Sequence, residues 1–171
     1  MDKSQKQLID TYFRKRNIGL NPYRSLQNYE IVYALRNDIK IDLSIVKTNL
    51  LAKLVSENPD LINKIDSTIF NIDDVLAILV NENGFGLYKH FGNRINKWYG
   101  NQLEDLLYNK PEYVDILDMS RLRGDNIKLL LRHRPNLVSK LDLSKLNSGQ
   151  IEDVLFHRPE LEKYFNNNHN G

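Results

Sequence analysis

The stretch Ile127-Lys-Leu-Leu-Leu-Arg-His-Arg-Pro-Asn-Leu137 recurs 24 residues later as Ile151-Glu-Asp-Val-Leu-Phe-His-Arg-Pro-Glu-Leu161. The same period relates Pro111 to Pro135, so the pattern extends beyond these two copies. A fixed period in the twenties is typical of architectures in which one supersecondary unit is stacked repeatedly. The period therefore decides the fold class before any single residue does.

The apolar residues inside one copy predict how the unit is built. Ile127, Leu130 and Leu131 follow the i, i+3, i+4 spacing of one buried helix face. Pro135 should end this helix, because the residue before a proline avoids the α region, and it suits the first position of a second short helix. Asp142 is then placed to cap one further helical turn. Each unit is thus a helix, a shorter helix and a capped turn.

Such units cannot bury their apolar faces alone, so the sequence predicts an all-α fold, an α-solenoid of stacked helix-turn-helix repeats of about 24 residues. We expect a single domain over residues 1–165, with an N-terminal capping helix and a degenerate first unit in 1–41 and regular repeats in 42–165. An atypical insertion at 83–92 interrupts the repeats, and we expect it to form a protruding loop or a distorted helix junction. Residues 166–171 read as a disordered tail. The units begin at Leu51, Val75, Leu103, Ile127 and Ile151.

The amino-acid composition excludes several kinds of functional site. The chain of 171 residues contains no cysteine, which excludes disulfide scaffolds, thiolate zinc sites and cysteine nucleophiles. No apolar run approaches the length of a membrane span, and the first residues do not resemble a signal peptide. The net charge of +2 hides an uneven distribution, with a basic start, an acidic middle and a basic segment at 120–146. This asymmetry bears on partners rather than on the fold.

Two groups of residues are candidates for binding another protein. The broken repeat concentrates aromatic residues and glycines, and insertions in repeat proteins often emerge on the binding face. The proline corners carry a recurring His-Arg pair, which stacking would align along one edge. Core filling explains Trp98 equally well, and solvated helix ends explain the basic pairs. The candidates are Tyr88, His90, Trp98, Tyr99, His133, Arg134, His157 and Arg158.

The basic segment supports a competing function, which is nucleic-acid binding. Lysine and arginine neutralise phosphates, and such binding weakens steeply with salt. The acidic middle of the chain would repel a phosphate backbone that followed the whole stack. The residues concerned are Arg121, Arg123, Lys128, Arg132, Arg134, Lys140 and Lys145.

The sequence predicts no catalytic residue, no cofactor and no metal. His133 and His157 could act as ligands or bases, but nothing near them in the sequence supplies further ligands or an orienting acid. Repeat equivalence explains both histidines without chemistry. Gly84-Phe-Gly86 lacks the lysine and the preceding strand of a phosphate-binding loop.

The unit Ile-x-x-Leu-Leu-x-x-Arg-Pro-x-Leu followed by Leu-Asp-Leu-Ser-Lys-Leu resembles tandem leucine-rich helical repeats of uncharacterised proteins from large-genome viruses and phages, over about residues 42–165. It is loosely similar to the longer repeats of mitochondrial transcription termination factors, which also place a proline at a helix start. The first resemblance implies a protein-binding module, a viral structural or host-interacting adaptor. Its partner would be a host or virion protein, and its location the host cytoplasm or the virion.

Overall fold

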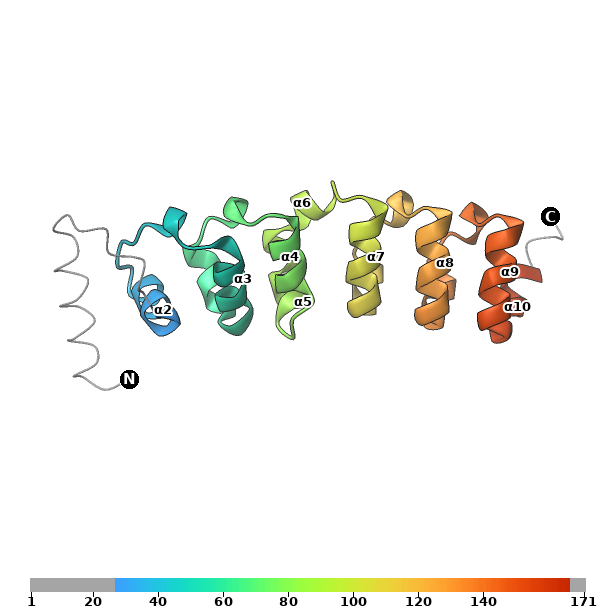
Figure 1. Cartoon of the computed structure of the whole chain (residues 1–171), viewed down its shortest axis with the longest axis horizontal. Helices are drawn as coiled ribbons and strands as arrows, with labels where there is room; N and C mark the ends of the chain where they lie inside the picture. The colour runs from blue at the N-terminus through green and yellow to red at the C-terminus, as the bar shows by residue number, and fades with distance from the viewer. Residues whose placement is uncertain (1–26, 167–171) are drawn as a thin grey trace. The chain divides into compact units, whose positions relative to one another are not determined.

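A computed structural model of the chain describes residues 27–166, and these residues form helices without any strand (Figure 1). The predicted all-α fold is therefore confirmed for the described part. The helices fall into two compact units, the first ending at Ile78 and the second beginning at Leu79. The predicted N-terminal cap lies largely outside the described residues, and so does the predicted tail beyond Asn166.

The first unit holds α-helices alternating with short 3₁₀ helices, here labelled η. They are α2 (Asn28–Arg36), η2 (Leu43–Ile45), α3 (Thr48–Glu57), η3 (Pro59–Lys64), η4 (Ser67–Ile69) and α4 (Ile72–Leu79), whose last residue opens the second unit. The second unit begins with three short helices, α5 (Gly84–Leu87), η5 (Tyr88–His90) and α6 (Gly92–Ile95). It continues with α7 (Gly100–Asn109), η6 (Pro111–Asp115), η7 (Met119–Arg121), α8 (Gly124–His133), η8 (Pro135–Lys140), η9 (Leu143–Lys145), α9 (Ser148–His157), η10 (Pro159–Leu161) and α10 (Glu162–Asn166).

One α-helix and two 3₁₀ helices make up the repeats that begin with α7 and α8, whereas α9 is followed by η10 and the short helix α10. The α-helices α7, α8 and α9 each contain 10 residues, and a proline starts the 3₁₀ helix that follows each of them. The sequence predicted the position of the short helix after each proline correctly, but it did not predict that this helix is a 3₁₀ helix. After Pro135 the Leu137 amide donates to the Arg134 carbonyl oxygen three residues earlier, at 3.0 Å. A run this short between a proline and a capped turn is typical of 3₁₀ geometry.

The core of the second unit follows the predicted helix face. Ile127, Leu130 and Leu131 are buried, and α8 packs against α7 on one side and α9 on the other. In α7 the equivalent residues Leu103, Leu106 and Leu107 are buried in the same way. In α9 only Val154 is fully buried. The apolar periodicity therefore predicted the packed face, and the last helix is covered less completely.

An aspartate caps the second 3₁₀ turn in four of the repeats, as predicted for Asp142. Its carboxylate accepts hydrogen bonds from the Ser144 amide at 3.2 Å and the Ser144 hydroxyl at 2.6 Å. Asp42, Asp66 and Asp118 accept from the amide two residues further on in the same way. Hydrogen bonds to the ionised carboxylate lower the pKa of all four aspartates.

Two glycines let consecutive repeats approach closely. A Cβ atom on Gly124 would lie 2.5 Å from the Lys145 carbonyl oxygen and 2.5 Å from Oε1 of Gln150, both in the next repeat. Gly100 faces Asn126 and the Arg121 carbonyl in the same way. These contacts leave no room for a side chain. The last repeat has Ser148 at the equivalent position, where no described repeat follows.

The insertion is helical and anchored to the rest of the unit. Of the two forms expected for it, the structure has the distorted helix junction and not the protruding loop. The ring of Tyr113 is fully buried, and its hydroxyl donates to the Leu79 carbonyl oxygen at 3.1 Å. Phe85 and Tyr88 from the insertion pack their rings on Tyr113, with centroids 5.2 and 5.9 Å away. Burial raises the pKa of Tyr113 far above its usual range. The other proline corners place leucine where Tyr113 stands, so this tyrosine is the local adaptation to the insertion.

Replacing Gly124 with Ala is expected to destabilise the protein by about 1–3 kcal/mol, because the new methyl group overlaps a backbone carbonyl that cannot move independently. The matched control is Ser148→Ala, for which we expect a change within about 0.5 kcal/mol. Urea unfolding of both variants makes the comparison. A stabilised Gly124→Ala protein, as the loss of glycine entropy alone would give, would contradict the close contact.

The capping aspartates should make stability fall in acid. Their pKa is lower in the folded chain, so their contribution is complete above the unfolded value of about 3.9 and is lost as the pH falls through the folded value. The double variant Asp118→Asn and Asp142→Asn keeps an acceptor oxygen but cannot titrate. We expect its unfolding free energy to drop less than that of the wild type between pH 6 and pH 3, measured by urea unfolding. Equal losses in the two proteins would refute this role.

Candidate binding groove

Two of the predicted basic residues join consecutive repeats. Nη1 of Arg121 donates to the Trp98 carbonyl oxygen at 3.3 Å. Lys145 stands 24 residues later, and its Nζ donates to the carbonyl oxygens of Ser120 at 2.8 Å and Leu122 at 3.0 Å. The acceptors Trp98 and Leu122 are themselves 24 residues apart. Both side chains therefore connect a 3₁₀ turn to the repeat before it.

The arginines before the prolines, which the sequence predicts as part of a partner-binding ridge, also join consecutive repeats. Nε of Arg134 donates to the Tyr108 carbonyl oxygen at 2.7 Å, and Nε of Arg158 donates to the Arg132 carbonyl oxygen at 2.7 Å. Tyr108 and Arg132 lie in the last turns of α7 and α8, where carbonyl groups lack intrahelical donors. We call these two contacts the arginine staples.

The two predicted histidines do not form a common site. His157 is held within the chain, because its Nδ1 contacts the Asp153 carbonyl oxygen at 2.8 Å and its Nε2 contacts Arg132 at 3.2 Å. Arg132 can only donate, so Nε2 must accept and Nδ1 carries the proton. His133 is exposed, with its ring edge against Tyr108 at a centroid distance of 5.3 Å. Within residues 27–166 no group of three His, Asp or Glu side chains could hold a metal ion.

The candidates in and beside the insertion differ in exposure, and of Tyr88, His90, Trp98 and Tyr99 only the last is exposed. Trp98 is 3% exposed and belongs to the core, because it fills the position of Leu122 in the next repeat. Tyr88 is half-buried against Tyr113. His90 is also half-buried, and burial lowers its pKa. Tyr99, by contrast, is 71% exposed.

Tyr99 borders a groove of about 1060 Å³ between the first turns of α7 and α8. The groove lies on the side of the second unit where these helices begin, near the top of Figure 1. It brings together residues from both predicted sets, Tyr99 from one and Arg121, Arg123 and Lys145 from the other. The remaining lining residues are Gly100, Asn101, Gln102, Ser120, Leu122, Asp125 and Asn126.

The groove residues Tyr99 and Arg123 occupy helix N-cap positions but do not cap. The Tyr99 amide donates to Oε1 of Gln102 at 2.8 Å, and the Arg123 amide donates to Oδ1 of Asn126 at 3.0 Å. Neither N-cap side chain accepts a capping hydrogen bond in return, and the guanidinium of Arg123 has no acceptor atom. Their side chains are exposed at the groove.

The equivalent positions on either side carry true N-caps. Asn147, one repeat after Arg123, accepts from the Gln150 amide at 2.9 Å. Asn71, which is separated from Tyr99 by one repeat and the insertion, accepts from the Asp74 amide at 2.9 Å. Asparagine is among the best N-cap residues. Lys47, the N-cap residue of α3 in the first unit, also lacks a capping side chain, but among α7, α8 and α9 the N-cap positions without asparagine are the two that line the groove. These two positions therefore give up a local stabilising contact.

The groove carries an excess of positive charge. Arg121, Arg123 and Lys145 line it, with Asp125 as the single acidic lining residue. Asp125 already accepts from Nε2 of Gln150 at 2.9 Å. Asp118 stands nearby: its pKa is lowered first by hydrogen bonds from Ser120, and further by the charges of Arg121 and Lys145. The field at this face therefore favours anionic groups.

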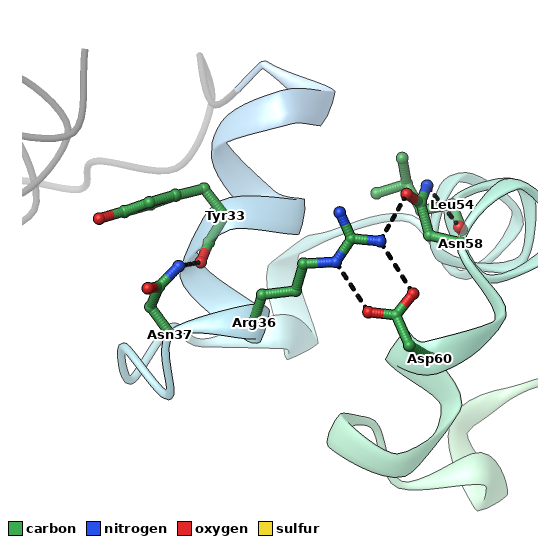
Figure 2. Close-up of polar contacts among 6 residues, drawn as sticks. All are labelled: Tyr33, Arg36, Asn37, Leu54, Asn58 and Asp60. Carbon is green, nitrogen blue, oxygen red and sulfur yellow. Dashed lines mark hydrogen bonds and ion pairs between the residues drawn. The ribbon is translucent and has the colours of Figure 1, made fainter. Parts of the chain in front are cut away.

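The first unit contains a smaller hollow of about 620 Å³ beside an arginine contact of a different kind (Figure 2). Arg36 binds both carboxylate oxygens of Asp60, at 2.7 and 2.8 Å, and also Oδ1 of Asn58 at 3.1 Å. Both partners are about half exposed, at 47% and 54% of their side chains. The contact connects the end of α2 to the proline corner after α3. The hollow is lined by Asn28, Tyr29, Val32, Tyr33, Arg36, Asn37, Leu54, Glu57 and Asn58.

Sequence reasoning missed some exposed and lining residues. Phe156 is 84% exposed, although its repeat equivalents are Tyr108 and Arg132. Gln102 and Asn126, the third residues of α7 and α8, were not singled out either, although they recur at the repeat period with Gln150. Their recurrence two residues after Gly100 and Gly124 was the sequence signal that could have identified them.

In comparisons with protein-family models, with curated proteins and with solved structures, no significant match to this chain was found. Among the described helices, none is long and apolar enough to cross a bilayer. The fold and the groove geometry therefore carry the functional argument.

Replacing Arg134 with Met should lower the free energy of unfolding by about 1 kcal/mol, because the methionine keeps the aliphatic stem but leaves the Tyr108 carbonyl without its donor. Arg123→Met is the matched control, since no described residue binds that guanidinium, and we expect it to change stability by less than about 0.5 kcal/mol. Urea unfolding measures both. Equal small effects would mean that the arginine staples do not stabilise the stack.

Proposed function

We propose that this chain is a non-catalytic α-solenoid that binds another protein in the groove between the first turns of α7 and α8. The single observation that carries the proposal is that Tyr99 and Arg123, two equivalent N-cap residues without capping side chains, are both exposed on one groove. Local rules of helix stability are broken in natural proteins mainly at functional or strained sites.

Repeated contacts within the second unit support the solenoid part of the proposal. The arginine staples, the contacts of Arg121 and Lys145, and the tight approaches at Gly100 and Gly124 all recur at the repeat period. Identical contacts between successive units are what a stacked repeat requires. Such stacks present rigid surfaces, and rigid scaffolds lower the cost of ordering a binding site.

The competing function, nucleic-acid binding, has weaker support. All of its seven basic residues except Arg123 and Lys128 already donate to other groups of the chain. Arg132 and Arg134 lie at the end of α8 opposite to the groove, and a ten-residue helix is about 15 Å long. Of the seven side chains, only those of Arg121, Arg123 and Lys145 line the groove.

The resemblance of the unit to repeats of virus and phage proteins supports a more specific assignment. A helical repeat that binds protein without catalysis would serve there as a structural or host-interacting adaptor. Its partner would be a host or virion protein, and it would act in the host cytoplasm or the virion. This step rests on the repeat pattern of residues 42–165 alone.

Selection from a displayed library of random peptides tests the function. We expect peptides enriched on the wild type to bind Lys128→Ala equally well but to bind the Tyr99→Ala, Arg123→Ala double variant at least about tenfold more weakly. Lys128 is the matched control, because it is a basic residue of α8 that does not line the groove. Thermal unfolding of all three proteins should be unchanged. Enriched peptides that bind the double variant as tightly as the wild type would place the binding surface elsewhere.

A further inference from the structure

We infer that the occupant of the groove is an acidic, extended peptide segment, held by carboxylate contacts to Arg123 and Arg121 and by an apolar side chain lying on Tyr99. This inference rests on the proposed protein-binding function and specifies the chemistry of the partner. It follows from the donors that remain free in the groove.

The basic side chains of the groove differ in how many of their hydrogen-bond donors already have an acceptor. Arg123 is exposed, and no described residue accepts a side-chain hydrogen bond from it. Arg121 uses Nη1 for the Trp98 carbonyl, which leaves Nε and Nη2 without an acceptor among the described residues. A guanidinium offers its donors in a planar fork that matches a carboxylate. Lys145 already donates to two carbonyls, so it contributes charge more than contacts.

Tyr99 supplies the apolar part of the recognition. Its side chain is 71% exposed at the rim of the groove, and it lies one repeat before Arg123 at the same N-cap position. Tyrosine offers a large apolar surface for little loss of side-chain entropy, and for this reason it is frequent at binding hot spots. Equivalent positions in successive repeats thus offer one aromatic and one cationic contact to the same ligand.

An extended segment fits the groove better than a helix does. The groove runs between the first turns of two neighbouring helices, and its lining includes the small residues Gly100 and Ser120. A helix with its side chains is about 10–12 Å across and would meet the flanking helices before reaching this floor. An extended chain instead alternates its side chains, so an acidic residue and an apolar residue can point to different walls.

Charge complementarity favours a peptide over a nucleic acid. Nucleic-acid affinity grows with the number of phosphates neutralised, and only Arg123 and part of Arg121 are unengaged here. Asp125 lies in the same lining and would repel an evenly charged phosphate backbone. A peptide can place a carboxylate beside Arg123 and a neutral residue beside Asp125, which a phosphate backbone cannot do.

The test uses fluorescence anisotropy with three labelled probes: the peptide Glu-Glu-Glu-Leu-Glu-Glu-Glu, its counterpart with Gln in place of each Glu, and a ten-residue oligothymidylate. We expect the acidic peptide to bind the wild type at least about tenfold more tightly than the other two probes. Arg123→Gln should weaken this binding by about tenfold and Tyr99→Ala by several-fold. The control Lys128→Gln should change it by less than about twofold.

Three outcomes would overturn the inference: no binding of the acidic peptide, equal binding of its Gln counterpart, or tighter binding of the oligothymidylate that is lost in Arg123→Gln. The last outcome would assign the groove to nucleic acid. The proposed function fails separately, through the library selection. If neutral peptides are enriched there and lose affinity in the Tyr99→Ala, Arg123→Ala variant, the groove binds protein and only its acidic specificity is refuted.

Discussion

The structure of the regular repeats depends on how each α-helix ends. Pro135 stops α8 and brings no amide hydrogen, so carbonyl groups in the last turn of the helix lack donors within it. A carbonyl group buried without a donor costs about 1–3 kcal/mol. The arginine staple from the next repeat supplies this donor, from Arg158 to the Arg132 carbonyl. Arg158, which precedes Pro159, thus supplies a donor at the end of α8, the helix that Pro135 ended. This contact couples one repeat to the next.

The opposite ends of the same helices are held by close contact together with hydrogen bonds from Lys145. Gly124 admits the Lys145 carbonyl and Gln150 of the next repeat against the first turn of α8, and Lys145 reaches back to the Leu122 carbonyl. Each regular repeat is thereby held to the next at both ends of its helix. The first unit reaches a similar result by other means, because Arg36 pairs with the carboxylate of Asp60 rather than with a carbonyl (Figure 2). An exposed pair of this kind is screened by solvent and contributes less.

The features predicted from the sequence were those that depend on residues close together in the chain. The 24-residue period predicted the spacing of α7, α8 and α9, the proline corners and the Asp142 cap, because helix faces, proline and capping act over a few residues. The predicted unit starts Leu103, Ile127 and Ile151 each lie three residues after the first residue of the helix. The fate of the basic residues could not be predicted in this way. Whether Arg134 faces solvent or a carbonyl depends on the neighbouring repeat, which lies close in space and 26 residues away in sequence. The choice between the two expected forms of the insertion could not be made for the same reason, since its aromatic rings pack on Tyr113, a residue of the following repeat.

The distinction between engaged and free side chains locates function in a repeat protein more reliably than charge or aromatic content does. Arg134, Arg158 and Lys145 recur with the repeat, and so do their acceptors; periodic recurrence is what a structural role produces. Tyr99 and Arg123 recur in position but not in chemistry, and they stand where asparagine caps the equivalent helices at Asn71 and Asn147. Lys47, the N-cap residue of α3 in the first unit, also lacks a capping side chain, so a missing cap does not by itself mark a site. What distinguishes Tyr99 and Arg123 is that both side chains are exposed on one groove, while the contacts between the repeats around them stay intact.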